Sequence, residues 1–345
     1  MSFTKLDPTD FVVSSDAVTA PAWSSNIPTL STFFTASVGA PTSSFYIDVY
    51  NTGSTNINSA VQFSIAYGQA QGTSSAPFNP LVAVNTPTRV NYGQYRNIVY
   101  GDNEAFFNFG TGNTACENVI AFAIDRNRYK ESLMPGTFNL KLGYRVSGTI
   151  NLTDNSNDVT VASYLDCGRV YDIVSGSDGT AKNSPLQTGA SAKGYTKSGS
   201  FGLFLPDIGL ILLNPLALSL QGSEGGLGIS WDATVGNTNK NVNELRAFEL
   251  VTSGSSFKLN SQETISSDYV FARIKNAEYN YSTNPSYITG SGNLIYSDFI
   301  YSPQTYMTTV GMYNDNNELL AVAKLSKPLV KDFTKEALIR VKLDW

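Results

Sequence analysis

The sequence contains no histidine and only two cysteines among its 345 residues. Without histidine, the usual base of nucleophilic triads and the commonest metal ligand are both missing. Zinc takes about four Cys or His ligands, so we expect no zinc site. We interpret Cys116 and Cys167 as reduced thiols because cytoplasmic thiols stay reduced, and a late disulfide between them is the alternative.

Charge is also scarce, with 15% charged residues and a net charge of −5. A typical globular chain has about 25% charged residues. The lysines and arginines are scattered, whereas a nucleic-acid binder normally gathers them into a stripe that neutralises phosphates. We therefore expect nucleic acid not to be the main partner. A polar but weakly charged surface is common in proteins whose surface contacts other proteins.

Long apolar runs are missing as well. The most apolar stretch, residues 201–220, is interrupted by Pro206 and Pro215 and is too broken to span a bilayer. The first residues lack the basic and apolar segments of a signal peptide. We expect a chain without a membrane span, made in a cytoplasm.

The dominant apolar period is two, which predicts a mainly β fold of β-sandwich or barrel-like modules with a few short helices. Residues 45–50 and 57–68 predict a hairpin across a polar turn. Residues 117–129 suit a buried strand or a helix, and their β-branched content favours the strand. Further strands are predicted at 96–100, 105–109, 138–146, 149–152, 159–173, 268–281, 294–300, 306–313, 318–326 and 337–345.

Other segments predict loops and short helices. Residues 175–202 and 221–243 are rich in Gly and Ser and predict exposed loops. Between them, residues 201–220 predict a buried strand pair or a strand leading into a helical turn. Residues 242–251 predict a helix capped by Asn241 or Asn243. We expect four segments: an extended N-terminal arm at 1–40, ordered against partners or else a disordered tail, a β domain at 41–175, a loop-rich middle region with a short helix at 176–260, and a C-terminal β domain at 261–345.

No complete catalytic or cofactor motif is present. The Gly-rich segment 222–228 lacks the Lys-Ser/Thr ending of a nucleotide loop, and residues 154–158 lack the distal Glu of a calcium loop. Carboxylates that could form catalytic pairs are present, but such residues ordinarily lie on solvated faces or cap helices: Asp166, Asp172, Asp178, Glu244 and Glu249. We therefore expect a protein that is not an enzyme and that uses no metal or cofactor.

Aromatic residues gather in one C-terminal segment, with Asn and Ser between them: Tyr279, Tyr281, Tyr287, Tyr296, Phe299, Tyr301 and Tyr306. Tyr and Asn suit wet contact surfaces, because they provide contact area at low entropy cost. The segment predicts a subunit interface or a receptor-facing surface, and cross-strand aromatic pairs on a sheet are an equally good explanation.

The last predicted strand alternates cleanly. Ala337, Ile339, Val341, Leu343 and Trp345 form one apolar face, which should meet the core. Leu338, Arg340, Lys342 and Asp344 form the other face. We expect Arg340 and Lys342 to be exposed or paired across an interface.

The segments beginning Phe271-Ala-Arg-Ile-Lys and Thr305-Tyr-Met-Thr-Thr resemble virion structural proteins of contractile-tailed bacteriophages, especially of the cyanophage type. The resemblance covers residues 269–345 well and the preceding hundred residues loosely. The hairpin at 310–323 also resembles, more weakly, one in the particle-proximal domain of phage tail-fibre proteins. This second resemblance implies that the C-terminal domain docks the chain on the particle.

The resemblance implies a structural subunit of a tailed-phage virion, in the tail, baseplate or collar, assembled in the host cytoplasm. Its partners would be other virion proteins and copies of itself. The alternatives are a capsid decoration or head-associated protein, and a receptor- or glycan-binding tail protein that contacts the host surface.

Overall fold

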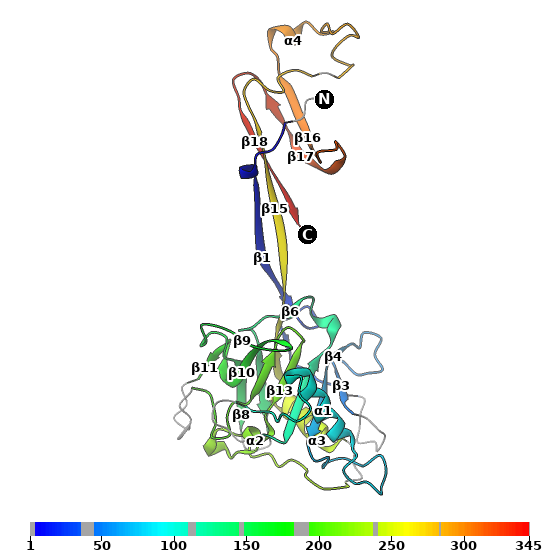
Figure 1. Cartoon of the computed structure of the whole chain (residues 1–345), viewed down its shortest axis with the longest axis vertical. Helices are drawn as coiled ribbons and strands as arrows, with labels where there is room; N and C mark the ends of the chain where they lie inside the picture. Colours follow the sequence, from blue (N-terminus) through cyan, green and yellow to red (C-terminus); the bar gives the residue numbers. More distant parts are fainter. Residues whose placement is uncertain are drawn as a thin grey trace. The chain divides into compact units, whose positions relative to one another are not determined.

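The computed structural model describes residues 4–35, 45–109, 115–144, 148–182, 193–236, 241–282 and 284–344. The chain forms two compact units (Figure 1). Unit 1 comprises Met1–Ala17 with Thr264–Trp345, and unit 2 comprises Val18–Glu263. The chain passes between the units within strands β1 (Phe11–Pro21) and β15 (Asn260–Ile274). The predicted mainly β class with few short helices is confirmed.

Unit 2 is built on a curled antiparallel half-barrel. Its strands, in spatial order, are β2 (Thr29–Leu30), β14 (Ser256–Lys258), β7 (Asn139–Gly143), β8 (Thr149–Asp154), β10 (Gly168–Ser177), β12 (Gly202–Leu205), β13 (Leu210–Leu213), β5 (Asn118–Ile124), β4 (Val61–Gln69) and β3 (Ile47–Tyr50). The short strands β9 (Ser163–Leu165) and β11 (Thr180–Ala181) pair with β10, and β6 (Ser132–Leu133) pairs with β15.

Both faces of this sheet are covered, which explains its uninterrupted apolar strands. On one face, helix α3 (Val242–Gly254) places Leu250 in the cluster that holds Phe63 and Phe122. On the other face, helix α1 (Pro87–Tyr100) places Tyr92 and Val99 in the cluster that holds Val119. The ambiguous stretch 117–129 is therefore mainly strand β5, and the predicted helix at 242–251 is confirmed.

Two other predictions for unit 2 are confirmed. Strands β3 and β4 form the expected antiparallel hairpin. The apolar stretch 201–220 gives both expected forms, the strand pair β12–β13 and then the short helix α2 (Pro215–Ser219). Asn214 caps this helix, because its side chain accepts hydrogen bonds from the backbone N–H groups of Leu216 and Ala217.

The strand predicted at 96–100 is wrong, because these residues end helix α1. Capping signals decide the local structure here. Thr86 accepts a hydrogen bond from Arg89 N–H, Pro87 occupies the first turn, and Gly101 ends the helix at φ 63°. Residues 105–109 form no strand either, since their pairing is one isolated bridge between Phe107 and Cys116.

Part of the expected N-terminal arm packs into unit 2. Trp23 is buried, its ring centre lies 4.8 Å from that of Phe257, and its Nε1 donates a 2.9 Å hydrogen bond to the Phe257 carbonyl. Leu30 and Phe33 are buried in the same cluster. Residues 18–35 thus belong to unit 2, because their three large apolar side chains pack in its core.

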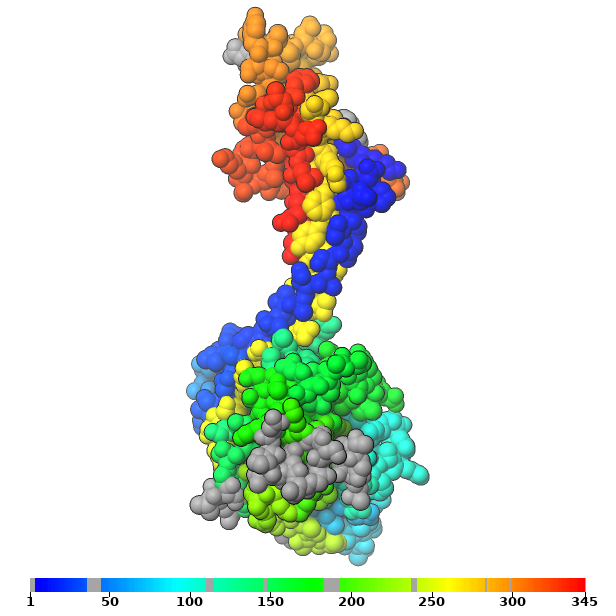
Figure 2. Space-filling model, turned by 90° about the vertical axis from the view of Figure 1, so that its left-hand side faces the viewer, coloured from blue at the N-terminus to red at the C-terminus, as the bar shows by residue number. Residues whose placement is uncertain are grey.

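Unit 1 has two sheets. Strands β1, β15 and β18 (Ala337–Asp344) form one of them, and Figure 2 shows these segments side by side in blue, yellow and red. The predicted hairpin of β16 (Thr305–Tyr313) and β17 (Leu319–Lys331) forms the other.

Two predictions for unit 1 are corrected. The strand predicted at 318–326 continues to Lys331 as β17, where the register shift between Met307 and Thr309 on β16 accommodates Pro328. Residues 294–300 are not a strand. Leu294 makes an isolated bridge to Ile288, and the short helix α4 (Asp298–Tyr301) follows.

The predicted faces of the last strand are confirmed for the described residues. Ile339 and Val341 are 7% and 6% exposed and pack with Val270 of β15, whereas Leu338 is 60% exposed. The hairpin β16–β17 adds Val310 and other residues to this cluster. Trp345 lies outside the described residues.

Candidate functional site

Unit 1 buries few apolar side chains. Among the described residues, its buried hydrophobic residues are Val270, Ile339 and Val341 alone. A core of this size stabilises a domain only weakly, because folding free energy comes chiefly from apolar burial. The apolar side chains that remain exposed on its strands therefore form a candidate contact surface.

One face of the β16–β17 hairpin carries the clearest group of exposed apolar side chains. Leu319, Leu320 and Val322 are 54%, 68% and 58% exposed. Val322 stands opposite Gly311, and the Tyr313 ring lies close over that glycine. We call Tyr313, Leu319, Leu320 and Val322 the outer hairpin face. Sequence reasoning did not select these residues as a site.

The predicted interface tyrosines all lie in unit 1, and the structure brings only some of them together. The Tyr287 ring centre lies 6.1 Å from that of Tyr296 and 6.0 Å from that of Phe299. Tyr279 shares a 3.0 Å hydroxyl contact with Thr4. The remaining tyrosines, Tyr281, Tyr301 and Tyr306, are strongly exposed and make no aromatic ring contact within the described residues.

The two predicted basic residues, Arg340 and Lys342, flank Tyr269 on the neighbouring strand. The Arg340 guanidinium lies 5.5 Å and the Lys342 amine 6.0 Å from its ring centre. Lys342 also pairs with Asp344 at 2.8 Å. These contacts give both residues an intramolecular role on the exposed face of β18.

Lys331 anchors the tyrosine-bearing segment to the hairpin. Its amine is fully buried and donates to the carbonyl of Asn276 at 2.9 Å, to Oδ1 of Asn280 at 2.7 Å and to the carbonyl of Asp332 at 2.9 Å. Asn280 is itself buried. All three donors of the ammonium are therefore satisfied inside unit 1.

Replacing Lys331 with Ala should lower the free energy of unfolding of unit 1 by about 1–3 kcal/mol, because three buried acceptors lose their donor. Lys327→Ala is the matched control, since Lys327 is exposed on the same strand. Chemical denaturation followed by circular dichroism measures both. Equal stabilities of the two variants would show that the Lys331 contacts do not hold this segment.

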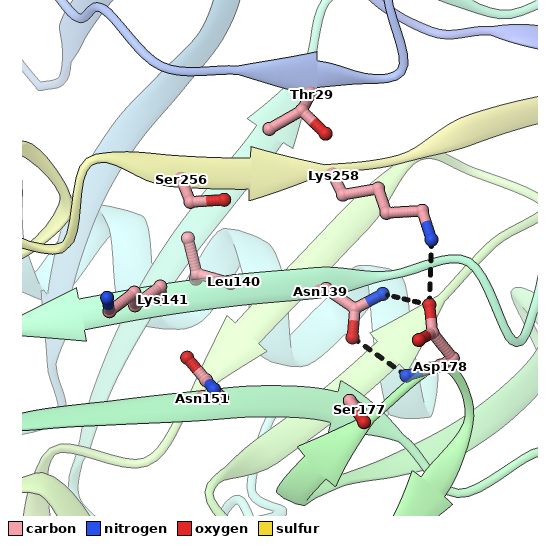
Figure 3. Close-up of a pocket in the computed structure, with 9 residues that line it drawn as sticks. All are labelled: Thr29, Asn139, Leu140, Lys141, Asn151, Ser177, Asp178, Ser256 and Lys258. Atoms are coloured by element: carbon pink, nitrogen blue, oxygen red, sulfur yellow. Dashed lines mark hydrogen bonds and ion pairs between the residues drawn. The ribbon is translucent and has the colours of Figure 1, made fainter.

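Unit 2 has a polar hollow of about 360 Å³ on its sheet (Figure 3). It is lined by Thr29, Asn139, Leu140, Lys141, Asn151, Ser177, Asp178, Ser256 and Lys258. Asn139 donates a 2.9 Å hydrogen bond to Asp178 Oδ1 and accepts a 2.8 Å bond from the Asp178 N–H. Lys258 pairs with the same carboxylate at 2.8 Å and lowers its pKa.

The polar contacts in this hollow hold a turn in place. Asp178 has φ 49° in the turn between β10 and β11, and the bonds from Asn139 and Lys258 hold it there. One carboxylate bound by a lysine and an amide supplies neither a free base nor a pair of acids. These contacts give the Asp178 carboxylate a structural role in holding the turn.

The residues of the nominal carboxylate pairs differ in burial and in their partners. Asp172 binds the Tyr195 hydroxyl, and burial raises the pKa of its carboxyl. Glu249 is exposed, whereas Glu244 of the same helix is buried. Within the described ranges, no group of three or more His, Cys, Asp or Glu residues is placed to hold a metal ion.

Glu244 is the most isolated of these groups. Its side chain is buried, Oε1 accepts a 3.3 Å hydrogen bond from the Tyr67 N–H, and Oε2 has no partner among the described residues. Burial raises the pKa of this carboxyl to about 8. The folded chain therefore holds Glu244 neutral where the unfolded chain would release its proton.

This shift predicts that the stability of unit 2 falls with rising pH. Between the ordinary carboxyl pKa and about 8, the folded chain binds more protons than the unfolded chain, so the free energy of unfolding decreases across that window. Glu244→Gln should flatten this decrease, whereas exposed Glu249→Gln should not. Denaturation at a series of pH values tests this, and identical pH profiles for wild type and Glu244→Gln would contradict it.

The two cysteines are free thiols. Cys116 is buried, which raises the pKa of its thiol to about 11. Cys167 is half-buried. The structure therefore agrees with the expectation of two separate thiols.

Comparisons with protein-family models, with curated proteins and with solved structures find no match for this chain. None of the helices in the described residues has the length and apolarity needed to cross a membrane.

Proposed function

We propose that the chain is a structural subunit of a tailed-bacteriophage virion, in the tail, baseplate or collar, and that it acts by protein–protein contact. Unit 1 is its docking module, and the outer hairpin face is the surface that another virion protein covers. The supporting observation is the exposure of Leu319, Leu320 and Val322 on a unit with so small a core.

The exposed apolar area of the hairpin favours a docking role for unit 1. Exposed apolar side chains that adjoin one another mark contact surfaces, because covering them removes apolar area from water. The resemblance of residues 269–345 to virion proteins covers the same unit. The uncharged outer hairpin face matches the charge-poor centre of a protein interface.

The test is to purify particles of the phage that encodes the chain and to identify their proteins by mass spectrometry. We expect the chain in the particles, and we expect it to remain after a high-salt wash because apolar contacts are not weakened by screening. Recovery of the chain only from the soluble lysate would contradict the proposal.

A further inference from the structure

Unit 2 carries a second exposed apolar group, on the loop between β4 and α1. We define the tip loop as residues 76–85. Leu81 is 91% exposed, and Phe78, Val82 and Val84 are exposed by 56%, 40% and 43%. Phe78 packs against Phe45 with ring centres 5.9 Å apart, and Tyr46 beside it is also exposed. Figure 1 shows the segment leaving the body of unit 2 beside α1.

Two hydrogen bonds close the base of the tip loop, which we call its neck. Thr86 Oγ1 donates to the Gly72 carbonyl at 2.9 Å, and Thr88 Oγ1 donates to the Thr73 carbonyl at 2.7 Å. Gly72 has φ 76°, and a Cβ there would lie 2.3 Å from the Val84 carbonyl oxygen, so the neck requires glycine.

Hydrogen bonds within the tip loop also order its backbone. The Phe78 N–H binds the Asn85 carbonyl at 2.9 Å, and the Val82 N–H binds the Asn79 carbonyl at 2.9 Å. Asn79 Oδ1 accepts a further 2.9 Å bond from the Leu81 N–H. Binding through such a loop costs little conformational entropy, because its backbone is already ordered.

The tip loop itself carries no charged residue. From Val49 to Thr88 the sequence has forty consecutive residues without Asp, Glu, Lys or Arg. The chain as a whole has a net charge of −5, so two copies repel each other. An uncharged surface is the place where two copies of an acidic chain approach most closely at least electrostatic cost.

We propose that the tip loop is a self-association surface, packing with Tyr46 against the same surface of a second copy of this chain. A closed twofold contact pairs identical surfaces, which an uncharged apolar surface permits without like-charge repulsion. Leu81 and Phe78 are the anchors of this contact. The surface is distinct from the outer hairpin face and does not depend on the proposed virion role.

Sedimentation equilibrium of the purified full-length chain tests the proposal. We expect self-association in the micromolar range, and Leu81→Asp should weaken it at least about tenfold, as for the loss of an interface anchor. Raising the salt concentration should leave association unchanged or strengthen it, because screening reduces the repulsion between copies.

Two control variants test whether the effect of Leu81→Asp is specific to the tip loop. Val161→Asp changes a side chain that is 78% exposed elsewhere in unit 2, and it should leave self-association unchanged. Leu320→Asp changes the outer hairpin face in unit 1 and should also leave it unchanged. A wild-type chain that stays monomeric to about 100 µM overturns the proposal. Unchanged association of a folded Leu81→Asp variant overturns it too, as does its loss in Leu320→Asp instead.

Discussion

Replacing Ile339 or Val341 with Asp is expected to unfold unit 1. Both side chains are nearly inaccessible and pack on Val270 across the β15–β18 pair, where Val270 stands opposite Val341. An aspartate at either position buries an unpaired charge, at a cost of several kcal/mol. With only three buried apolar residues in the part of unit 1 that the structure describes, this unit has little stability to offset the cost.

Leu338→Asp is the matched control for this experiment. Leu338 adjoins Ile339 in the same strand but points to the exposed face. The same chemical change should therefore leave unit 1 folded. Limited proteolysis and thermal denaturation distinguish the two variants. A stable Ile339→Asp chain would show that the strand's register is wrong and would remove the basis for placing the docking surface on the hairpin.

Replacing Leu320 or Val322 with Asp is expected to leave unit 1 folded and to abolish incorporation of the chain into particles. Both side chains are exposed in the isolated chain, so a carboxylate there remains hydrated and costs little stability. In an assembled interface the same carboxylate would be desolvated without a partner, which weakens binding by several kcal/mol.

Complementation of a phage lacking the chain measures this effect. Particles assembled with each variant are purified, and the amount of chain per particle is determined by quantitative mass spectrometry. Val161→Asp serves as the control, because it adds the same charge to an exposed valine in unit 2. Normal incorporation of Leu320→Asp would exclude the outer hairpin face as the docking surface.

The strands with alternating side chains were predictable, because alternation shows which side chains meet a core. The β18 faces show this best, since Ile339 and Leu338 fall on opposite sides as the sequence predicts. Helix α1 is not predicted because Ile98, Val99 and Tyr100 are β-branched or aromatic and favour a strand, whereas the helix is set by the Thr86 cap, Pro87 and Gly101. The sequence signal for this helix lies at its two ends and not within residues 96–100.

The candidate surfaces were less predictable. Exposed tyrosines were found from composition, but the outer hairpin face was not, although Leu319-Leu320-Ala-Val-Ala carries apolar residues at both parities. Leu319 stands opposite Tyr313 and Ala321 opposite Met312, and the register shift between them leaves Leu320 without a paired residue, so strict alternation does not place Leu319 and Leu320 on one face. The contact between Tyr287 and Tyr296 depends on the turn at Gly292, where φ is 83°, and strand periodicity does not reveal it.

Hydroxyl-radical footprinting of the chain, in isolation and within purified particles, tests whether another virion protein covers the outer hairpin face. We expect Leu319, Leu320 and Val322 to be oxidised several-fold less in particles than in the free chain. Val161, exposed in the free chain and outside the outer hairpin face, provides the internal reference. Equal oxidation of the outer hairpin face in both states would show that no virion protein covers it.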